Sequence, residues 1–157
     1  MADKYEQLED QIVARIAAQV PTFASVVAVA SSDSGVLGDG PRPRCEVIWN
    51  RTETRTVDAV AGRIRVTDDV VFSVLIYAGD AGLIQGGARR GTGGAYDLRG
   101  QVRKALLGFE PVVSTIETVF PMAPTVGSSE DVFQIETGLY GLKAEWTITV
   151  NSYEGQG

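Results

Sequence analysis

The sequence contains no histidine, only one cysteine, and no apolar run long enough to cross a membrane. Without histidine the chain lacks the commonest general base, the commonest metal ligand and every Ser–His or Cys–His nucleophile pair. Cys45 alone can form no intrachain disulfide and cannot supply a four-ligand zinc site, so we interpret it as a small buried hydrophobic residue. The sequence therefore predicts a protein that is not an enzyme and needs no metal or cofactor.

Targeting signals are also missing from the sequence. The first residues do not follow the basic-then-apolar layout of a signal peptide, and a membrane-spanning helix needs about 20 apolar residues. We therefore expect no membrane association and assembly in the cytoplasm of the cell that makes the chain. At 157 residues, with 44% hydrophobic and 22% charged residues, the chain has the size and composition of one globular domain over 1–157.

Apolar residues recur every three or four positions in two segments, which predicts two helices. The first covers about residues 3–20, where Asp3 can cap the start and Pro21 ends the helix. The second covers about 95–107, and Gly108 and Pro111 mark its end. Between the helices, the segments near 31–43 and 79–94 are rich in glycine and polar residues and predict long loops.

Alternating and continuous apolar patterns predict the strands of one sheet. The almost wholly apolar run 70–77 indicates a central strand covered on both faces. Other strands are predicted from Cys45 onward, at 63–66 as an edge strand, and at 112–119, 131–137 and 142–153, with a turn at 138–141 joining the last two. The order of these elements predicts an α+β fold with a single mixed, largely antiparallel sheet and two helices packed on one face.

The charged residues are distributed unevenly. Residues 1–109 hold 13 basic and 13 acidic side chains, whereas 110–157 hold Lys143 against seven acidic residues. A basic element and an acidic C-terminal third are two complementary surfaces, which a head-to-tail interface between copies needs. The alternative is that these charges merely solvate a helix face. The predicted interface residues are Arg89, Arg90, Arg99, Arg103, Lys104, Glu130, Asp131, Glu136 and Glu145.

Two other patterns could carry chemistry. The segment 89–94 combines two arginines with glycines before a helix, a place where backbone N–H groups can hold phosphate, but it fits neither the P-loop nor the GxGxxG spacing. The acidic pairs Asp68–Asp69 and Glu130–Asp131 are adjacent in sequence and match no calcium-loop spacing, so we interpret them as solvated turn residues. A small nucleotide- or anion-binding protein is thus the less favoured reading.

Four segments together resemble the Mu-like and lambda-like bacteriophage tail terminator proteins. They are YEQLEDQIVARIA near the start, VVFSVLIYA, the helix and exit LRGQVRKALLGFEP, and the final AEWTITVNSY. The resemblance implies a structural subunit of the virion that forms a homo-hexameric ring on the head-proximal end of the tail tube. The family has no catalytic residues to transfer.

In that role the ring would bind the tail tube protein, end tube polymerisation and offer a surface to the head-neck connector proteins. DNA would pass through the lumen without specific binding, which agrees with a net charge of -6, because an acidic chain does not attract phosphate. The alternative within the same class is another neck or tail-completion protein that joins head and tail.

Overall fold

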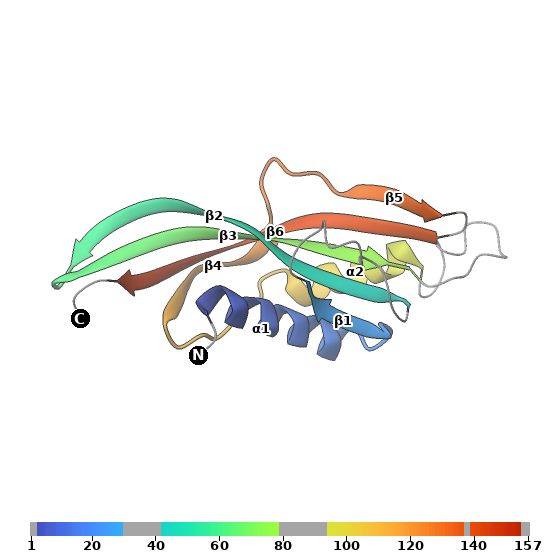
Figure 1. Cartoon of the computed structure of the whole chain (residues 1–157), viewed down its shortest axis with the longest axis horizontal. Coiled ribbons are helices and arrows are strands. Elements are labelled where there is room, and N and C mark those ends of the chain that lie inside the picture. The colour runs from blue at the N-terminus through green and yellow to red at the C-terminus, as the bar shows by residue number, and fades with distance from the viewer. Residues whose placement is uncertain (1–2, 30–41, 79–93, 137–138, 155–157) are drawn as a thin grey trace.

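The computed structural model describes residues 3–29, 42–78, 94–136 and 139–154 (Figure 1). For 132–136 and 139–140 this description is of the backbone. Its helices are α1 (Lys4–Gln19) and α2 (Ala95–Leu106). Its strands are β1 (Ser25–Ala28), β2 (Arg44–Val60), β3 (Arg63–Tyr77), β4 (Ile116–Pro124), β5 (Asp131–Glu136) and β6 (Leu139–Glu154). The α+β fold predicted from the sequence is confirmed.

The six strands form one mixed sheet in the order β1-β2-β3-β6-β4, and β5 pairs with β6. Only β1 and β2 run parallel; β2–β3, β3–β6, β4–β6 and β5–β6 are antiparallel. Strand β3 pairs with one edge of β6, from Tyr77↔Gly141 to Ile64↔Glu154. The other edge of β6 pairs first with β5, near the start of β6, and then with β4. The sheet is therefore largely antiparallel, as the alternating patterns predict.

Both helices pack on the same face of the sheet (Figure 1). Asp3 caps α1 by accepting a hydrogen bond from the Tyr5 N–H at 2.8 Å, and Leu8, Ile12 and Ile16 form its buried face. The chain leaves α2 through Gly108, whose φ of 79° lies in the left-handed region that glycine adopts without strain. Arg15 donates to the Ala105 carbonyl at 3.0 Å, so the two helices lie side by side.

Strand β3 provides the centre of the core. Its residues from Val70 to Tyr77 are all buried, which confirms a central strand covered on both faces. Phe72 and the other residues of its helix side pack against both helices, whereas Leu75 and Tyr77 pack with Ile48 on the other side. Cys45 is fully buried on the helix side, as expected of a small hydrophobic residue.

The hairpin of β2 and β3 extends well beyond the helices (Figure 1). It turns at Ala61 and Gly62, with φ of 50° and 80°, and its distal half is exposed, with 62% of Val57 accessible. The segment 63–66 is therefore the start of β3, lying between β2 and β6, and the prediction of a separate edge strand is wrong. The periodicity of 63–66 and 70–77 belongs to one strand that is exposed at one end and buried at the other.

Two further sequence interpretations are corrected. The strand predicted at 112–119 lies later, at Ile116–Pro124, because Val113 is part of the turn that returns from α2. Asp68 is not a turn residue but a buried position in β3, where Thr54 and Tyr5 donate to its carboxylate at 2.8 and 3.3 Å. The predicted loops at 31–43 and 79–94 fall largely outside the described residues. Of the turn predicted at 138–141, residue 138 lies outside them, and residues 139–141 already belong to β6.

Candidate assembly surfaces

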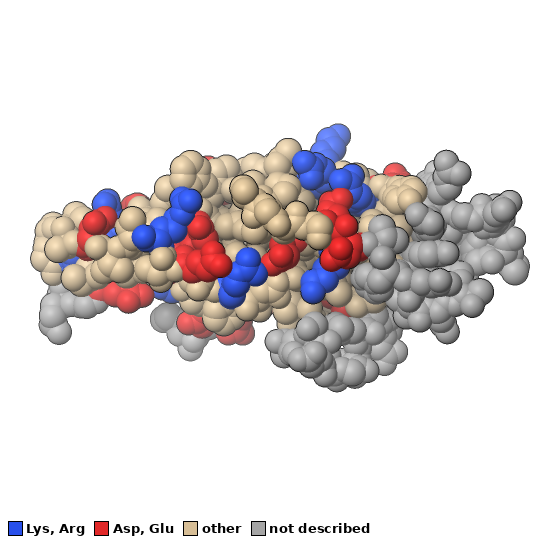
Figure 2. Space-filling view, turned by 90° about the horizontal axis from the view of Figure 1, so that it is seen from above, with Lys and Arg blue, Asp and Glu red and all other residues tan. Residues whose placement is uncertain are grey.

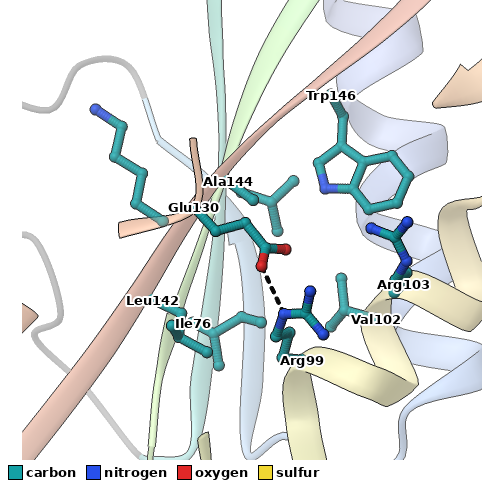
Figure 3. A pocket seen from close by; sticks show the side chains of 10 residues that line it. Ile76, Arg99, Val102, Arg103, Glu130, Leu142, Ala144 and Trp146 are labelled. Atoms are coloured by element: carbon teal, nitrogen blue, oxygen red, sulfur yellow. Dashed lines mark hydrogen bonds and ion pairs between the residues drawn. The ribbon is translucent and has the colours of Figure 1, made fainter. Parts of the chain in front are cut away.

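A groove runs between α2 and the start of β5 and β6. Arg99 and Arg103 project from α2 into it, beside Glu130 and Trp146 (Figure 3). Arg99 Nε donates to Glu130 Oε2 at 2.6 Å. Val102 and Leu142 form an apolar floor below the charges, and the part of the groove toward Ser128 encloses about 180 Å³. This arrangement of an apolar floor and a charged rim is typical of a surface that binds another protein chain.

Three of the predicted interface residues form ion pairs within the same chain, and a fourth lies beside one of these pairs. Arg99 pairs with Glu130, and Arg51 Nη1 pairs with Glu145 at 2.8 Å. Arg103 lines the same groove as Arg99. The sequence had placed the basic helix and the acidic C-terminal third on separate surfaces, whereas at Arg99 and Glu130 the structure brings them together.

The remaining predicted residues are placed as follows. Lys104 is exposed on α2, and Asp131 is exposed at the start of β5, where Ser129 Oγ lies 3.4 Å from its carboxylate. The backbone of Glu136 ends β5. Arg89 and Arg90, with the glycine-rich segment that suggested anion binding, lie outside the described residues. The assignment of all nine residues to an interface stays a prediction.

Away from the buried Ile48, Leu75 and Tyr77, the face of the sheet opposite the helices is polar, and three of its arginines are paired with acids. Figure 2 looks onto the molecule from this side and shows acidic and basic side chains interleaved along the part that is not grey. Three arginines of the hairpin pair with acids here, and Thr149 donates to Asp69 at 2.5 Å. The pairs are Arg51 with Glu53 and Glu145, Arg55 with Asp69 at 3.0 Å, and Arg65 with Asp58 at 3.0 Å.

On the helix side, α1 is fixed to β2 near the middle of that strand. The rings of Tyr5 and Trp49 stack with centroids 4.8 Å apart, and Trp49 Nε1 donates to Thr52 at 3.1 Å. Glu9 accepts the backbone N–H of Trp49 at 2.8 Å. Sequence reasoning missed this contact; the available signal was Glu9, an acidic residue one position from the apolar stripe of α1.

Glu9 and Tyr77 are among the groups whose pKa values are raised. Burial raises the pKa of Glu9, the hydrogen bond from Trp49 opposes that shift, and the nearby Asp10 and Glu6 carboxylates raise the pKa further. Burial, together with the adjacent Glu46, also raises the pKa of Tyr77. Glu46 is fully buried and accepts from Arg44 Nε at 2.8 Å, so a charged pair lies beneath the end of the sheet.

Within the described ranges, no three Cys, Asp or Glu side chains come together as a possible metal site. Neither α1 nor α2 combines the length and the apolar composition of a membrane-spanning helix. The features that the described part of the chain does offer are surfaces: the groove of α2, the paired polar face and the edge of β2 beside α1.

Comparison with known proteins gives a likeness of fold. No protein-family model matches this sequence, and no curated protein matches it. The structure is similar to that of a chain from the virion of a native gene transfer agent particle, with a TM-score of 0.52 and 16% sequence identity. The similarity of fold covers 92% of this chain and 95% of that chain.

Proposed function

We propose that this protein is a structural subunit of a phage-like virion, and within that class a tail terminator. The observation that carries the proposal is the fold, which matches a virion chain over almost the full length of both. The tail terminator resemblance of the sequence adds the more specific role. In this proposal the protein is not an enzyme and assembles into a homo-hexameric ring.

The two faces of the sheet support a ring with the helices outside. A ring around DNA needs an inner surface that does not hold phosphate, because each basic contact releases counterions and strengthens binding. On the polar face, Arg51, Arg55 and Arg65 are each paired with an acid of the same chain. DNA therefore passes such a surface without specific binding, while the helices remain available to contact other proteins.

The proposed ring caps the head-proximal end of the tail tube. One rim binds the tail tube protein and ends its polymerisation, and the other rim offers a surface to the head-neck connector proteins. The long hairpin of β2 and β3 is suited to one of these contacts because it extends beyond the helices and exposes Val57 and Ile64 (Figure 1).

The test is addition of the purified protein to growing tail tubes. A terminator stops elongation at substoichiometric amounts relative to tube subunits, and negative-stain images show a ring at one end of each tube. Continued elongation with the protein bound instead to DNA-filled heads contradicts the terminator role and indicates a neck or tail-completion protein. Binding to neither partner contradicts the virion proposal as a whole.

A further inference from the structure

The two helices form a layer with two distinct outer flanks. Helix α1 contacts β1 and β2, and α2 contacts β3 and β6, so the helices lie toward opposite edges of the sheet. Arg15 binds the backbone of α2 at Ala105, and Gln11 binds the backbone at Val112 in the turn after α2, which identifies the inner flank of α1. Positions on the other side of each helix therefore face away from the partner helix.

The outer flank of α1 is acidic. Glu9 reaches the β2 edge by binding the Trp49 N–H, and Glu6 and Asp10 are exposed beside it, since residues three or four apart share a helix side. These carboxylates raise the pKa of Glu9 through their like charge. The neighbouring positions Val13 and Ala17 bring no positive charge to this flank.

The outer flank of α2 is basic and partly apolar. Arg99 and Arg103, four positions apart, line the groove on the side of α2 that faces Trp146 and Glu130 (Figure 3). The exposed Lys104 lies about 100° further round the helix, on its solvent side. Tyr96 and Leu107 are exposed on α2 as well, at 46% and 55%. Because Glu130 pairs with only one of the two arginines, this flank keeps a positive excess.

The sheet has an open strand edge at each of the same two ends. Beside α1, β1 pairs with β2 only from Arg44 to Val47, and Glu9 accepts a hydrogen bond from the Trp49 N–H. Among the described residues, no strand pairs with the outer edge of Asn50–Val60. Beside α2, β5 is likewise the last described strand. Strand β4 is a poorer edge, because it contains Pro121 and Pro124 and its Met122 already pairs with Gly108 and Phe109.

Strand direction permits the two open edges to join. Strand β5 is antiparallel to β6, and β6 runs in the direction of β2, so β5 of a second copy placed beside β2 continues the antiparallel alternation. Its six residues fit within the open segment of β2, which is longer. An edge that meets a different edge gives a head-to-tail contact, the kind that closes into rings.

We propose that the α1 and β2 end of one copy binds the α2 and β5 end of a second copy, with Glu6 and Asp10 facing Arg103 of that copy and Lys104 adding positive charge on the solvent side of the same helix. This inference rests on the proposed ring and specifies its interface. In this interface the partner of the basic helix α2 is the N-terminal helix α1 and not the acidic C-terminal third. Charge complementarity sets the orientation of the two copies, and the strand edges supply backbone hydrogen bonds.

The test is a charge swap in the full chain. One variant carries Glu6→Lys with Asp10→Lys, a second carries Arg103→Glu with Lys104→Glu, and a third carries all four substitutions. Arg99 is left intact so that its pair with Glu130 is not disturbed. The matched control, Glu110→Lys with Ser114→Lys, changes exposed residues of the turn after α2.

Ring formation is measured by mass in solution and by negative stain, both alone and on purified tail tubes. Each two-residue variant is expected to need at least about tenfold more protein to assemble, because like charges then meet across the interface. The four-residue variant recovers assembly, which a folding defect does not predict. The control assembles like the wild type.

The outcomes separate this inference from the proposed function. If all variants form rings as readily as the wild type, or if the four-residue variant fails to recover, the proposed interface is wrong while the terminator role stands. If the swap restores rings that do not stop tube growth, the interface stands and the terminator role is wrong.

Discussion

Arg99 on α2 and Glu130 before β5 form an ion pair with a 2.6 Å contact, although 31 positions separate them in the chain. The sequence suggested that these two charges serve opposite sides of a subunit. In the structure they close one side of the groove above Val102 and Trp146 (Figure 3). A contact with a second copy must therefore use the cations that this pair leaves over.

The Arg99–Glu130 pair should contribute little to folding stability. Both side chains are partly exposed, at 41% and 35%, so solvent screens their attraction. We expect a coupling free energy below about 1 kcal/mol from a double-mutant cycle of Arg99→Ala and Glu130→Ala in urea unfolding. A coupling above about 2 kcal/mol would show that the pair is a structural part of the groove.

Phe72 should be one of the most costly residues to truncate. It is fully buried in the centre of β3 and packs against the helix layer, so Phe72→Ala leaves a cavity and should lower the free energy of unfolding by about 3–5 kcal/mol. Val126, which is 99% exposed, provides the control, and Val126→Ala should change stability by less than about 0.5 kcal/mol. Equal losses for the two variants would contradict the described core.

The fold was predictable where a pattern reports burial directly. The apolar stripes predicted both helices to within a few residues, because each helix buries one face. The continuous apolar run 70–77 identified the central strand, because that strand buries both faces. The hairpin was misread for the same reason. Its distal part is largely exposed, so Arg63–Val66 alternates without the continuous apolar run that begins at Val70, and the two pieces were read as separate strands.

The candidate surfaces were only partly predictable, because charge counts ignore which residues meet in space. The basic residues of α2 were recognised, but the pairing of Arg99 with Glu130 and of Arg51 with Glu145 depends on long-range strand order. The acidic flank of α1 was overlooked for a related reason. In the total charge of the first 109 positions, its acidic residues are balanced by basic residues. None of the basic residues that the structure describes, however, lies on this flank of α1.

The stacked rings of Tyr5 and Trp49 should couple α1 to the middle of β2. Aromatic pairs at a centroid distance of 4.8 Å contribute about 0.5–1.5 kcal/mol beyond the area they bury. A double-mutant cycle of Tyr5→Ala and Trp49→Ala, measured by urea unfolding, should give a coupling in this range. Tyr5→Phe keeps the ring and serves as the control; it should retain most of the stability, because the Tyr5 hydroxyl contact to Asp68 is long at 3.3 Å.

Cys45 should be unreactive in the folded protein. Its side chain is fully buried, so a reagent in solution cannot reach the sulfur. Burial also raises the pKa of the thiol above its ordinary value, so the reactive thiolate does not form. We expect no reaction with an aromatic disulfide reagent at about pH 8 over hours, and one equivalent of reaction once denaturant is added. Rapid labelling of the native protein would mean that β1 and the end of β2 open readily.

Glu9 should make stability depend on pH in a direction opposite to that of most carboxylates. Burial first, and the Asp10 and Glu6 charges in addition, raise its pKa in the folded protein above the ordinary value of 4.5, despite the hydrogen bond from Trp49. The folded state thus binds this proton more tightly than the unfolded chain does. The ionised form of Glu9 therefore lowers stability, and the loss is absent below about pH 4.5 and develops as the pH rises through the raised pKa.

Comparison with Glu9→Gln isolates this effect, because the amide oxygen can still accept the Trp49 N–H but carries no charge. Unfolding free energies of both proteins, measured in urea from about pH 4 to about pH 8, should diverge in favour of the variant as the pH rises, and the difference should then stay constant. Glu110→Gln, at an exposed position in the turn after α2, should give no such divergence. A difference that is flat, or that favours the wild type at high pH, would mean that the hydrogen bond outweighs burial and that the acidic flank is not strained by its own charge.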